Sequence, residues 1–330
     1  MSERSDKSAV VQASSLQKNA DGTPAPQLLP WTPRQLALAA VMLLAAIFAM
    51  WSCWADWLNI SFHIEEHSHV FLVVPFGAAI IYVNRNRFRN IRSGSSWVGP
   101  LIVAVGWVMG WYGFNFAHQS MWHMGAVLVA VGAAVSVLGH GVLVQFWPAF
   151  LMLGFMVPVP NGIRLGMATP LQTGTASVVE HLFRAFGEPV GRQGNSLTIN
   201  GHPVLIAEAC NGLRMVFTLI LVCWLFAFVT PMKNWVRWMI ILLSPITALV
   251  CNVIRLIPTV LMYGYSTKNA ADQFHEYSGW AMVPIAFFVL MFVVSFIKAL
   301  GFEVRDDEDE QGGTIKKKAE NVESSVAVLS

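Results

Sequence analysis

The residues with the clearest chemical potential form the run Glu208-Ala-Cys-Asn-Gly-Leu-Arg214, where a polar segment gives way to the apolar stretch 215–229. A helical spacing of four places Arg214 beside Cys210, one turn further along the helix. The amide groups at a helix N-terminus and a neighbouring guanidinium both stabilise a thiolate, the nucleophilic form of cysteine. A lone free cysteine is more often a small buried hydrophobe. In this setting, the pattern instead predicts that Cys210 is a reactive thiol at a membrane surface.

A second candidate is the arginine that ends Cys251-Asn252-Val-Ile-Arg255, inside the apolar stretch 237–263. It lies roughly 12 Å along the helix from Tyr263, which stands near the outer end. An arginine at membrane depth is costly and normally faces a partner or a wet cavity. The alternative is a structural pair with a buried carboxylate, but the apolar stretches contain almost no Asp or Glu. The available partners are Glu208, a thiolate at Cys210 or a substrate oxygen, and we favour a functional role.

A third candidate is His275, in the polar run Phe274-His-Glu-Tyr-Ser-Gly279. The run is predicted to be a loop that precedes the last apolar stretch. A loop histidine is by default solvated and inactive. This one is among the few titratable groups predicted for the face that carries Cys210, so a catalytic role and an inactive one are equally open.

The composition places these residues in a membrane protein. Of the 330 residues, 55% are hydrophobic and 12% are charged, against roughly 25% charged in soluble domains. Thirteen tryptophans fit aromatic belts at two membrane interfaces. Stretches of about 20 apolar residues mark spans. We predict eight of them, at 35–53, 69–84, 97–116, 121–139, 142–159, 209–230, 237–263 and 279–300.

The distribution of Lys and Arg gives the orientation. The turn Arg85-Asn-Arg87-Phe-Arg89 is strongly basic and is therefore predicted to be cytoplasmic. Alternation then places Lys233, both termini and the basic run 316–318 on the same side. The loops predicted to lie outside are 54–68, 117–120, 160–208 and 264–278.

The long outer segment 160–208 is predicted to carry structure of its own. Apolar positions recur at near-helical spacing, and Pro170 is expected to begin a helix rather than lie inside one. We therefore predict an interfacial amphipathic helix at 170–186. The runs 196–199 and 203–206 flank Asn200-Gly201, a strong hairpin signal, and the hairpin leads directly to the cysteine helix.

Metal and disulfide chemistry receive little support. A cluster of His and Glu in the first loop (His63, Glu65, Glu66, His67 and His69) could hold zinc, although substrate contact or a solvated face is favoured. We predict no metal site and no cofactor. Of the four cysteines, only Cys53 and Cys210 reach the outer edge of the predicted spans, so a disulfide framework is not expected.

Taken together, these motifs resemble the exosortase/archaeosortase family of integral-membrane sorting enzymes. The resemblance covers roughly residues 60–295. It is carried by Ser68-His69, Val74-Pro75, Phe146-Trp-Pro148, Met156-Val-Pro-Val-Pro160, Pro170-Leu-Gln172, Gly194-Asn195, Glu208 to Arg214, Asn252-Val-Ile-Arg255 and His275. The chain departs from the pattern at Asn211, where serine is usual, and at Val70, where glycine is common.

The resemblance implies an all-α polytopic membrane protein with about eight transmembrane helices, an outer amphipathic helix and a short β-hairpin before the catalytic helix. From this resemblance and the composition of the two ends, we predict three parts: a disordered cytoplasmic tail at 1–34, an exosortase-like membrane domain at 35–300 and a charged cytoplasmic tail at 301–330. The expected location is the cytoplasmic (inner) membrane, with the active site on the outer, periplasmic face.

The resemblance also implies a cysteine-type membrane endopeptidase or transpeptidase. Its substrates would be exported, membrane-anchored proteins with a C-terminal sorting signal made of a PEP-CTERM-like motif, a membrane helix and a basic end. The acceptor would be a lipid, a glycan or water, and no nucleic acid is involved. The catalytic positions carry over to Cys210, Arg255 and His275. The residues predicted to bind substrate or support the oxyanion are Arg214, Glu208, Asn211, Asn252 and His69.

Two other classes remain open. A non-catalytic receptor for tailed membrane proteins would keep the groove and tolerate loss of the thiol. A transporter or lipid-handling protein would distribute charged residues near the midplane of several spans, whereas this chain places them toward the outer face.

Overall fold

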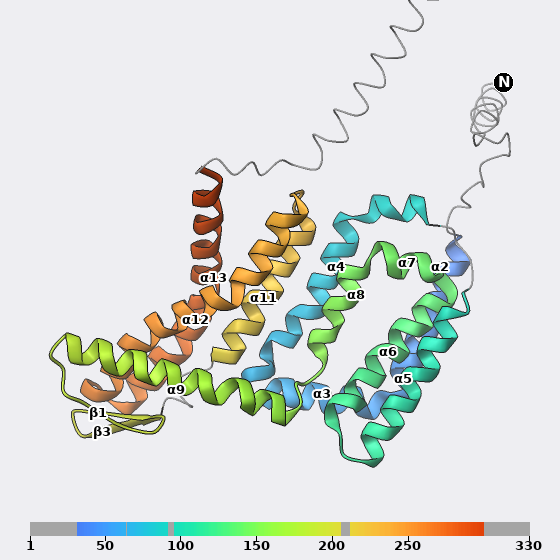
Figure 1. Cartoon of the computed structure of the whole chain (residues 1–330). Helices are drawn as coiled ribbons and strands as arrows, with labels where there is room; N and C mark the ends of the chain where they lie inside the picture. Colours follow the sequence, from blue (N-terminus) through green and yellow to red (C-terminus); the bar gives the residue numbers. More distant parts are fainter. Residues whose placement is uncertain (1–31, 64, 92–95, 206–211, 300–330) are drawn as a thin grey trace, which may run out of the picture.

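The computed structural model describes residues 32–63, 65–91, 96–205 and 212–299. Helices dominate this part of the chain, and a small sheet interrupts them (Figure 1). In order, the elements are α2 (Pro33–Ala49), α3 (Trp51–His63), η1 (Glu65–Leu72), α4 (Val73–Val83), η2 (Arg85–Asn90), α5 (Val98–Asn115), α6 (Gln119–Leu138), α7 (His140–Gln145), α8 (Trp147–Met152), η3 (Leu153–Met156), α9 (Asn161–Ala185), β1 (Val190–Gln193), β2 (Ser196–Ile199), β3 (His202–Leu205), α11 (Gly212–Val229), α12 (Asn234–Tyr265) and α13 (Lys268–Ala299).

The membrane class is confirmed, but the count of eight spans is not. Within the described residues, four helices are long and apolar enough to cross a membrane: α5, α6, α12 and α13. The pair α2 and α3 bends by 74°, and the α8–η3 segment bends by 84° relative to α9, which gives at most six spans if each pair counts as one. The predicted spans 69–84 and 209–230 correspond to shorter apolar helices, at His67–Val83 and Leu213–Val229.

The predicted boundary between the fourth and fifth spans is present. Gly139 ends α6 with a φ of 88°, a conformation that glycine adopts without steric cost. The chain then continues through the two short helices α7 and α8, each of six residues, rather than through one long fifth span.

The outer helix differs from the prediction. Helix α9 begins at Asn161 and not at residue 170, and Pro170 lies inside it. A proline inside a helix loses one backbone hydrogen bond, which leaves the carbonyl of Gly166 without its helical donor. Both Gly166 and Pro170 are exposed, so water or lipid headgroups can satisfy that carbonyl. The helix therefore continues through the proline.

The hairpin is confirmed, and a third strand extends it. Strands β2 and β3 pair antiparallel with Ile199 opposite His202, and β1 pairs with β2 on the other edge. Asn200 and Gly201 form the turn with φ values of 50° and 78°. The Asn200 side-chain amide donates to the carbonyl of Gly264 in α12 at 3.1 Å.

The sheet packs against the membrane helices through its apolar face. Leu197 and Ile199 are fully buried, together with Val179 of α9 and with Leu256 and Val260 of α12. Because the sheet is anchored on both α9 and α12, the end of β3 has a defined position near the lower ends of the helices in Figure 1.

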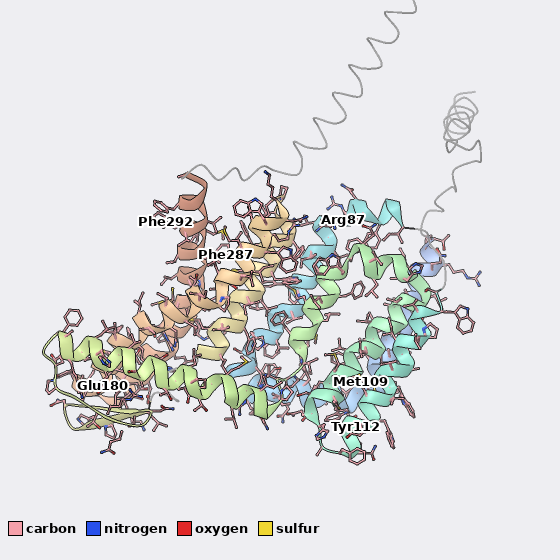
Figure 2. The ribbon with its side chains drawn as sticks, viewed as in Figure 1. Arg87, Met109, Tyr112, Glu180, Phe287 and Phe292 are labelled. Carbon is pink, nitrogen blue, oxygen red and sulfur yellow. The ribbon has the colours of Figure 1, made fainter. Side chains whose placement is uncertain are left out.

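The connections separate into two ends, as the alternation of the loops predicts. The basic turn η2 and the α11–α12 connection lie at one end, while α9, the sheet and the α5–α6 turn lie at the other (Figure 1). Figure 2 shows the same separation in side chains, with Arg87 far from Glu180 and Tyr112. The assignment of the basic end to the cytoplasm remains a prediction from the positions of Lys and Arg.

Candidate active site

Arg255 is buried in α12, with 2% of its surface exposed. Its Nη2 donates to the side-chain oxygen of Asn252 at 3.1 Å, and its Nη1 donates to the backbone oxygen of His275 at 3.4 Å. Asn252 is also buried. The motif Asn252-Val-Ile-Arg255 thus has a physical basis, because the asparagine one turn earlier on the same helix face orients the guanidinium.

Arg214 reaches the same place from α11. A Cβ atom built on Gly279 of α13 would lie 2.9 Å from Nη2 of Arg214 and 3.2 Å from Nη1 of Arg255. The two nitrogens are therefore within about 6 Å of each other, because each lies within 3.2 Å of the same point. The Arg214 guanidinium also lies over the Trp280 ring, 5.5 Å from its centroid. Three helices thus bring two guanidinium groups together at one glycine.

These groups line a cavity of about 320 Å³. Arg214, Thr218, Arg255, Gly279 and Trp280 contribute to its wall, and His69 with its neighbours in η1 completes it. His69 is 7% exposed, and its ring stacks on Phe217 of α11 with centroids 5.3 Å apart. The cavity is thus mostly apolar, with two cationic groups and an imidazole in its wall, an arrangement suited to binding a developing negative charge.

His275 lies beside this cavity, but the prediction that it occupies a loop is wrong. It belongs to α13, which begins at Lys268 and runs to Ala299 without a break. The polar run 268–278 extends the apolar helix because it contains neither proline nor glycine to end it. The backbone oxygen of His275 accepts from Arg255 and from the Ser278 hydroxyl, the latter at 3.1 Å. Of the two candidate histidines, His69 lines the cavity together with Arg214 and Arg255, whereas His275 is not among the lining residues.

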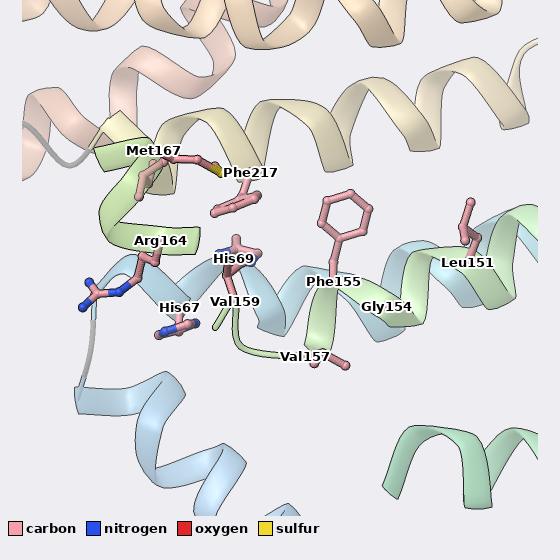
Figure 3. A pocket seen from close by; sticks show the side chains of 11 residues that line it. His67, His69, Leu151, Gly154, Phe155, Val157, Val159, Arg164, Met167 and Phe217 are labelled. Carbon is pink, nitrogen blue, oxygen red and sulfur yellow. The ribbon is translucent and has the colours of Figure 1, made fainter. Parts of the chain in front are cut away.

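A second cavity of about 310 Å³ also has His69 in its lining (Figure 3). The lining comes from η1, the segment from α8 to Val159, the start of α9 and the start of α11. Phe155, Met167 and Phe217 form much of its apolar wall, and His67 and Arg164 lie toward one end (Figure 3).

Three predicted site residues, Glu208, Cys210 and Asn211, lie outside the described residues. In the sequence, Cys210 comes two residues before the first residue of α11 and four before Arg214. The described cysteines Cys53, Cys223 and Cys251 are buried and not disulfide-bonded. Among the described residues, no cluster of three or more His, Cys, Asp or Glu side chains has a geometry that could hold a metal ion.

Sequence reasoning missed Gly279 and Trp280. A signal was present, because Gly279 follows His275 by four residues and so lies on the same face of a helix. Interpreting the run as a loop hid this relation. The pairing of His69 with Phe217 had no local signal, because it depends on how η1 packs against α11.

Comparison with known proteins assigns the chain that carries this site to a family. A search of curated proteins and a search of solved structures each found no match. The family model described as transmembrane exosortase (Exosortase_EpsH) matches residues 57–292, which include His69, Arg214, Asn252, Arg255 and His275 as well as Cys210. Because the match covers well over half of the chain and every residue of the candidate site, the protein belongs to the transmembrane exosortase family.

Proposed function

We propose that this exosortase is a cysteine-dependent transpeptidase that cleaves exported proteins at a C-terminal PEP-CTERM-like sorting signal and transfers them to an acceptor. Members of the family are membrane-embedded processing enzymes that act on exported proteins with sorting signals. A signal made of a motif, a membrane helix and a basic end would place the motif just outside the membrane. The basic end would then lie on the side of the basic turn η2.

One observation carries the proposal: the convergence of Arg214 and Arg255 on Gly279 within a cavity. Arg214 stands in the first turn of α11, and Cys210 precedes it by four residues in the sequence. Two guanidinium groups in a mostly apolar cavity form a preorganised site for an oxyanion. That charge develops on the carbonyl oxygen when a thiolate attacks an amide.

In the proposed first step, the thiolate sulfur of Cys210 attacks the scissile carbonyl. A carbon–sulfur bond forms, and the electron pair of the carbonyl moves to its oxygen, which Arg255 and Arg214 stabilise. The tetrahedral intermediate then collapses and the carbon–nitrogen bond breaks. A protonated histidine, His275 in our proposal, supplies the proton to the leaving amine.

The products of this step are a thioester on Cys210 and a released fragment that contains the membrane helix and the basic end. An acceptor nucleophile, or water, then attacks the thioester and returns the thiolate. Asn252 contributes by holding Arg255 in position through the 3.1 Å hydrogen bond. Glu208, Asn211 and His69 are proposed to contact substrate.

Replacement of Cys210 tests the proposal. Cys210→Ala should leave the abundance of the membrane protein unchanged while tailed substrate accumulates at full length. Cys210→Ser should be nearly inactive as well, because a hydroxyl is much harder to deprotonate than a thiol. Cys53→Ala, Cys223→Ala and Cys251→Ala serve as matched controls and should each retain processing. Mature product made by the Cys210→Ala strain would overturn nucleophilic catalysis and leave the receptor hypothesis standing.

Covalent trapping gives a second, direct readout. A tailed substrate incubated with purified enzyme should leave a hydroxylamine-sensitive adduct on Cys210, as expected for a thioester. A transporter or a receptor would form no such adduct.

A further inference from the structure

A third cavity, of about 280 Å³, lies at the opposite end of α11 from the candidate active site (Figure 1). Four parts of the chain form its wall: the end of α4 with the turn η2, the α7–α8 segment, the end of α11 and the start of α12. Along α11, Arg214 lines the active-site cavity and Phe228 lines this one, so roughly 21 Å of helix separate the two. We call it the basic-end cavity, because the basic turn η2 contributes to it.

Two arginines from different elements give the basic-end cavity its charge. Arg87 comes from η2 (Figure 2), and Arg237 stands in the first turn of α12, where the amide groups of the helix N-terminus add positive potential. The described residues that line the cavity include no Asp or Glu. A wall with charges of one sign focuses their field into the cavity and therefore favours an anionic ligand.

The orientation of Arg237 is fixed by its surroundings. Its Nε donates to the carbonyl of Ala227 at 2.7 Å, and its Nη2 donates to the carbonyl of Met232 at 3.4 Å. Its Nη1 donates to the side-chain oxygen of Asn234. The guanidinium also lies over the Phe228 ring, 5.0 Å from its centroid. A planar guanidinium held in this way loses little entropy when it binds a phosphate.

The other polar side chains of the cavity supply hydrogen-bonding groups. The side-chain nitrogen of Asn84 donates to the carbonyls of Ile80 and Phe228 at 2.9 and 3.1 Å, which ties α4 to the end of α11. Both bonds use the nitrogen, so the amide oxygen can accept from a hydroxyl group of a ligand. Arg87 donates to the backbone oxygen of Gln145 at 3.4 Å, and the Gln145 side chain also lines the cavity. The cavity thus offers cations for an acidic group and amides for hydroxyls.

Two tryptophans place the cavity at a membrane interface. Trp147 and Trp238 line it, are 39% and 44% exposed, and stack with their ring centroids 6.4 Å apart. Exposed tryptophan in a membrane protein is enriched at the level of the lipid headgroups. Helix α12, which begins at Asn234, is one of the helices long and apolar enough to cross a membrane. We therefore expect the cavity to open at the level of the phosphates of one leaflet.

We propose that the basic-end cavity binds the headgroup of an anionic glycerophospholipid of the phosphatidylglycerol type. Arg87 and Arg237 would bind the phosphodiester, and the amides would bind the headgroup hydroxyls. The acyl chains would lie along the exposed rings of Trp147 and Trp238, which a soluble phosphate could not use. A zwitterionic headgroup would instead bring an ammonium group close to two arginines. Binding at this site requires neither the thiol nor a tailed substrate, so it goes beyond the proposed function.

Lipid titration of the full-length protein tests the proposal. The protein, freed of lipid in a neutral detergent, is titrated with phosphatidylglycerol or with phosphatidylcholine. The thermal unfolding midpoint reports binding, because a ligand that binds only the folded state stabilises it. Native mass spectrometry identifies the lipid that stays bound. We expect phosphatidylglycerol to bind roughly tenfold more tightly, because only this lipid brings a net negative charge to the two arginines.

A pair of matched variants locates the site. Arg87→Gln should weaken phosphatidylglycerol binding roughly tenfold, since it removes one of the two charged donors. Arg87 is exposed, so the midpoint without lipid should stay unchanged. Arg85→Gln is the control: it removes the same charge from the same turn, but Arg85 does not line the cavity and lies over the Tyr82 ring. Its affinity should stay within about twofold of wild type, because an exposed charge outside the site contributes little.

The outcomes separate the lipid from other occupants. Equal affinity of Arg87→Gln and Arg85→Gln, or of the two lipids, would overturn the proposal. A shift of the midpoint by inorganic phosphate at the same concentration would show a site for soluble anions instead. Lipid binding that appears only after the acidic run 306–310 is neutralised to Asn and Gln would assign the cavity to the C-terminal tail. Cys210→Ala should bind phosphatidylglycerol like wild type, so the lipid site and the proposed function can fail independently.

Discussion

Two contacts between helices in this protein, one between α5 and α6 and one between α13 and the pair α11 and α12, depend on glycine for different reasons. Helices α5 and α6 approach so closely that a Cβ on Gly106, Gly113 or Gly125 would lie within 3 Å of backbone atoms of the other helix. Between α13 and its neighbours α11 and α12, a Cβ on Gly279 would instead meet the ends of two arginine side chains. At the α5–α6 contact glycine lets the two backbones approach, and at Gly279 it leaves room for two charged side chains.

The physical reason differs accordingly. Lipid tails are as apolar as leucine, so membrane helices gain little from burying apolar surface and associate through close packing of small residues. The α5–α6 contact follows that rule and contains no charged side chain at these glycines. The contact at Gly279 places two cationic side chains between apolar helices, which is energetically unfavourable and is typical of a functional site. Three substitutions test this contrast and a fourth tests the hairpin, in order of decreasing expected effect.

Arg255→Lys should cause the largest loss, because the planar guanidinium that bonds Asn252 and His275 is replaced by a single ammonium. Loss of one oxyanion donor typically lowers kcat by about 10²–10³-fold. The rate of adduct formation on Cys210 measures this loss of activity, and gel filtration measures the folded fraction of the variant. Nearly normal rates for the lysine variant would reduce Arg255 to a general counter-charge.

Gly125→Leu tests the packing half of the contrast. The new side chain would collide with the backbone at Gly110, so the two helices must separate. Overpacking of this kind costs about 1–3 kcal/mol. We expect a lower unfolding midpoint in detergent, with normal adduct formation per folded molecule. Gly174→Leu, at an open helical position, should leave the midpoint unchanged. A variant that is stable but chemically inactive would contradict the division between the two regions.

Gly279→Ala tests the functional half. An added methyl group would push against Arg214 and Arg255 at 2.9 and 3.2 Å, so one or both guanidinium groups must shift by a few tenths of an ångström. We expect adduct formation to slow roughly tenfold, less than the ~10²-fold cost of a 1 Å misplacement. The unfolding midpoint should rise or stay constant, because alanine favours helix over glycine. Gly174→Ala is the control, and equal rates in both variants would show that Gly279 does not position the arginines.

Gly201→Ala should have the smallest effect. The hairpin turn holds this residue at a φ of 78°, which costs an alanine about 1–2 kcal/mol. The penalty falls on the hairpin, whose apolar face remains packed on α12. We expect faster amide exchange in β2 and β3 with adduct formation reduced less than threefold. Unchanged exchange would show that packing alone, and not the turn, holds the sheet.

The sequence alone determined the membrane class, the family and the hairpin. Each of these depends on a local pattern: long apolar stretches, the motifs around Cys210 and Arg255, and the pair Asn200-Gly201. Local patterns were less reliable where a helix contains a proline or extends into a polar run. Helix α9 passes through Pro170, and α13 begins at Lys268 in a polar run that was predicted to be a loop.

Only the tertiary structure decided how the site is assembled. Arg214, Arg255 and Gly279 are separated by 41 and 24 residues in the sequence, and no periodicity links them. Their meeting depends on the packing of α11, α12 and α13. The stacking of His69 on Phe217 likewise joins η1 to α11, and His69 lines both cavities. Sequence spacing constrains neighbours within one helix, whereas contacts between helices are decided by which faces pack together.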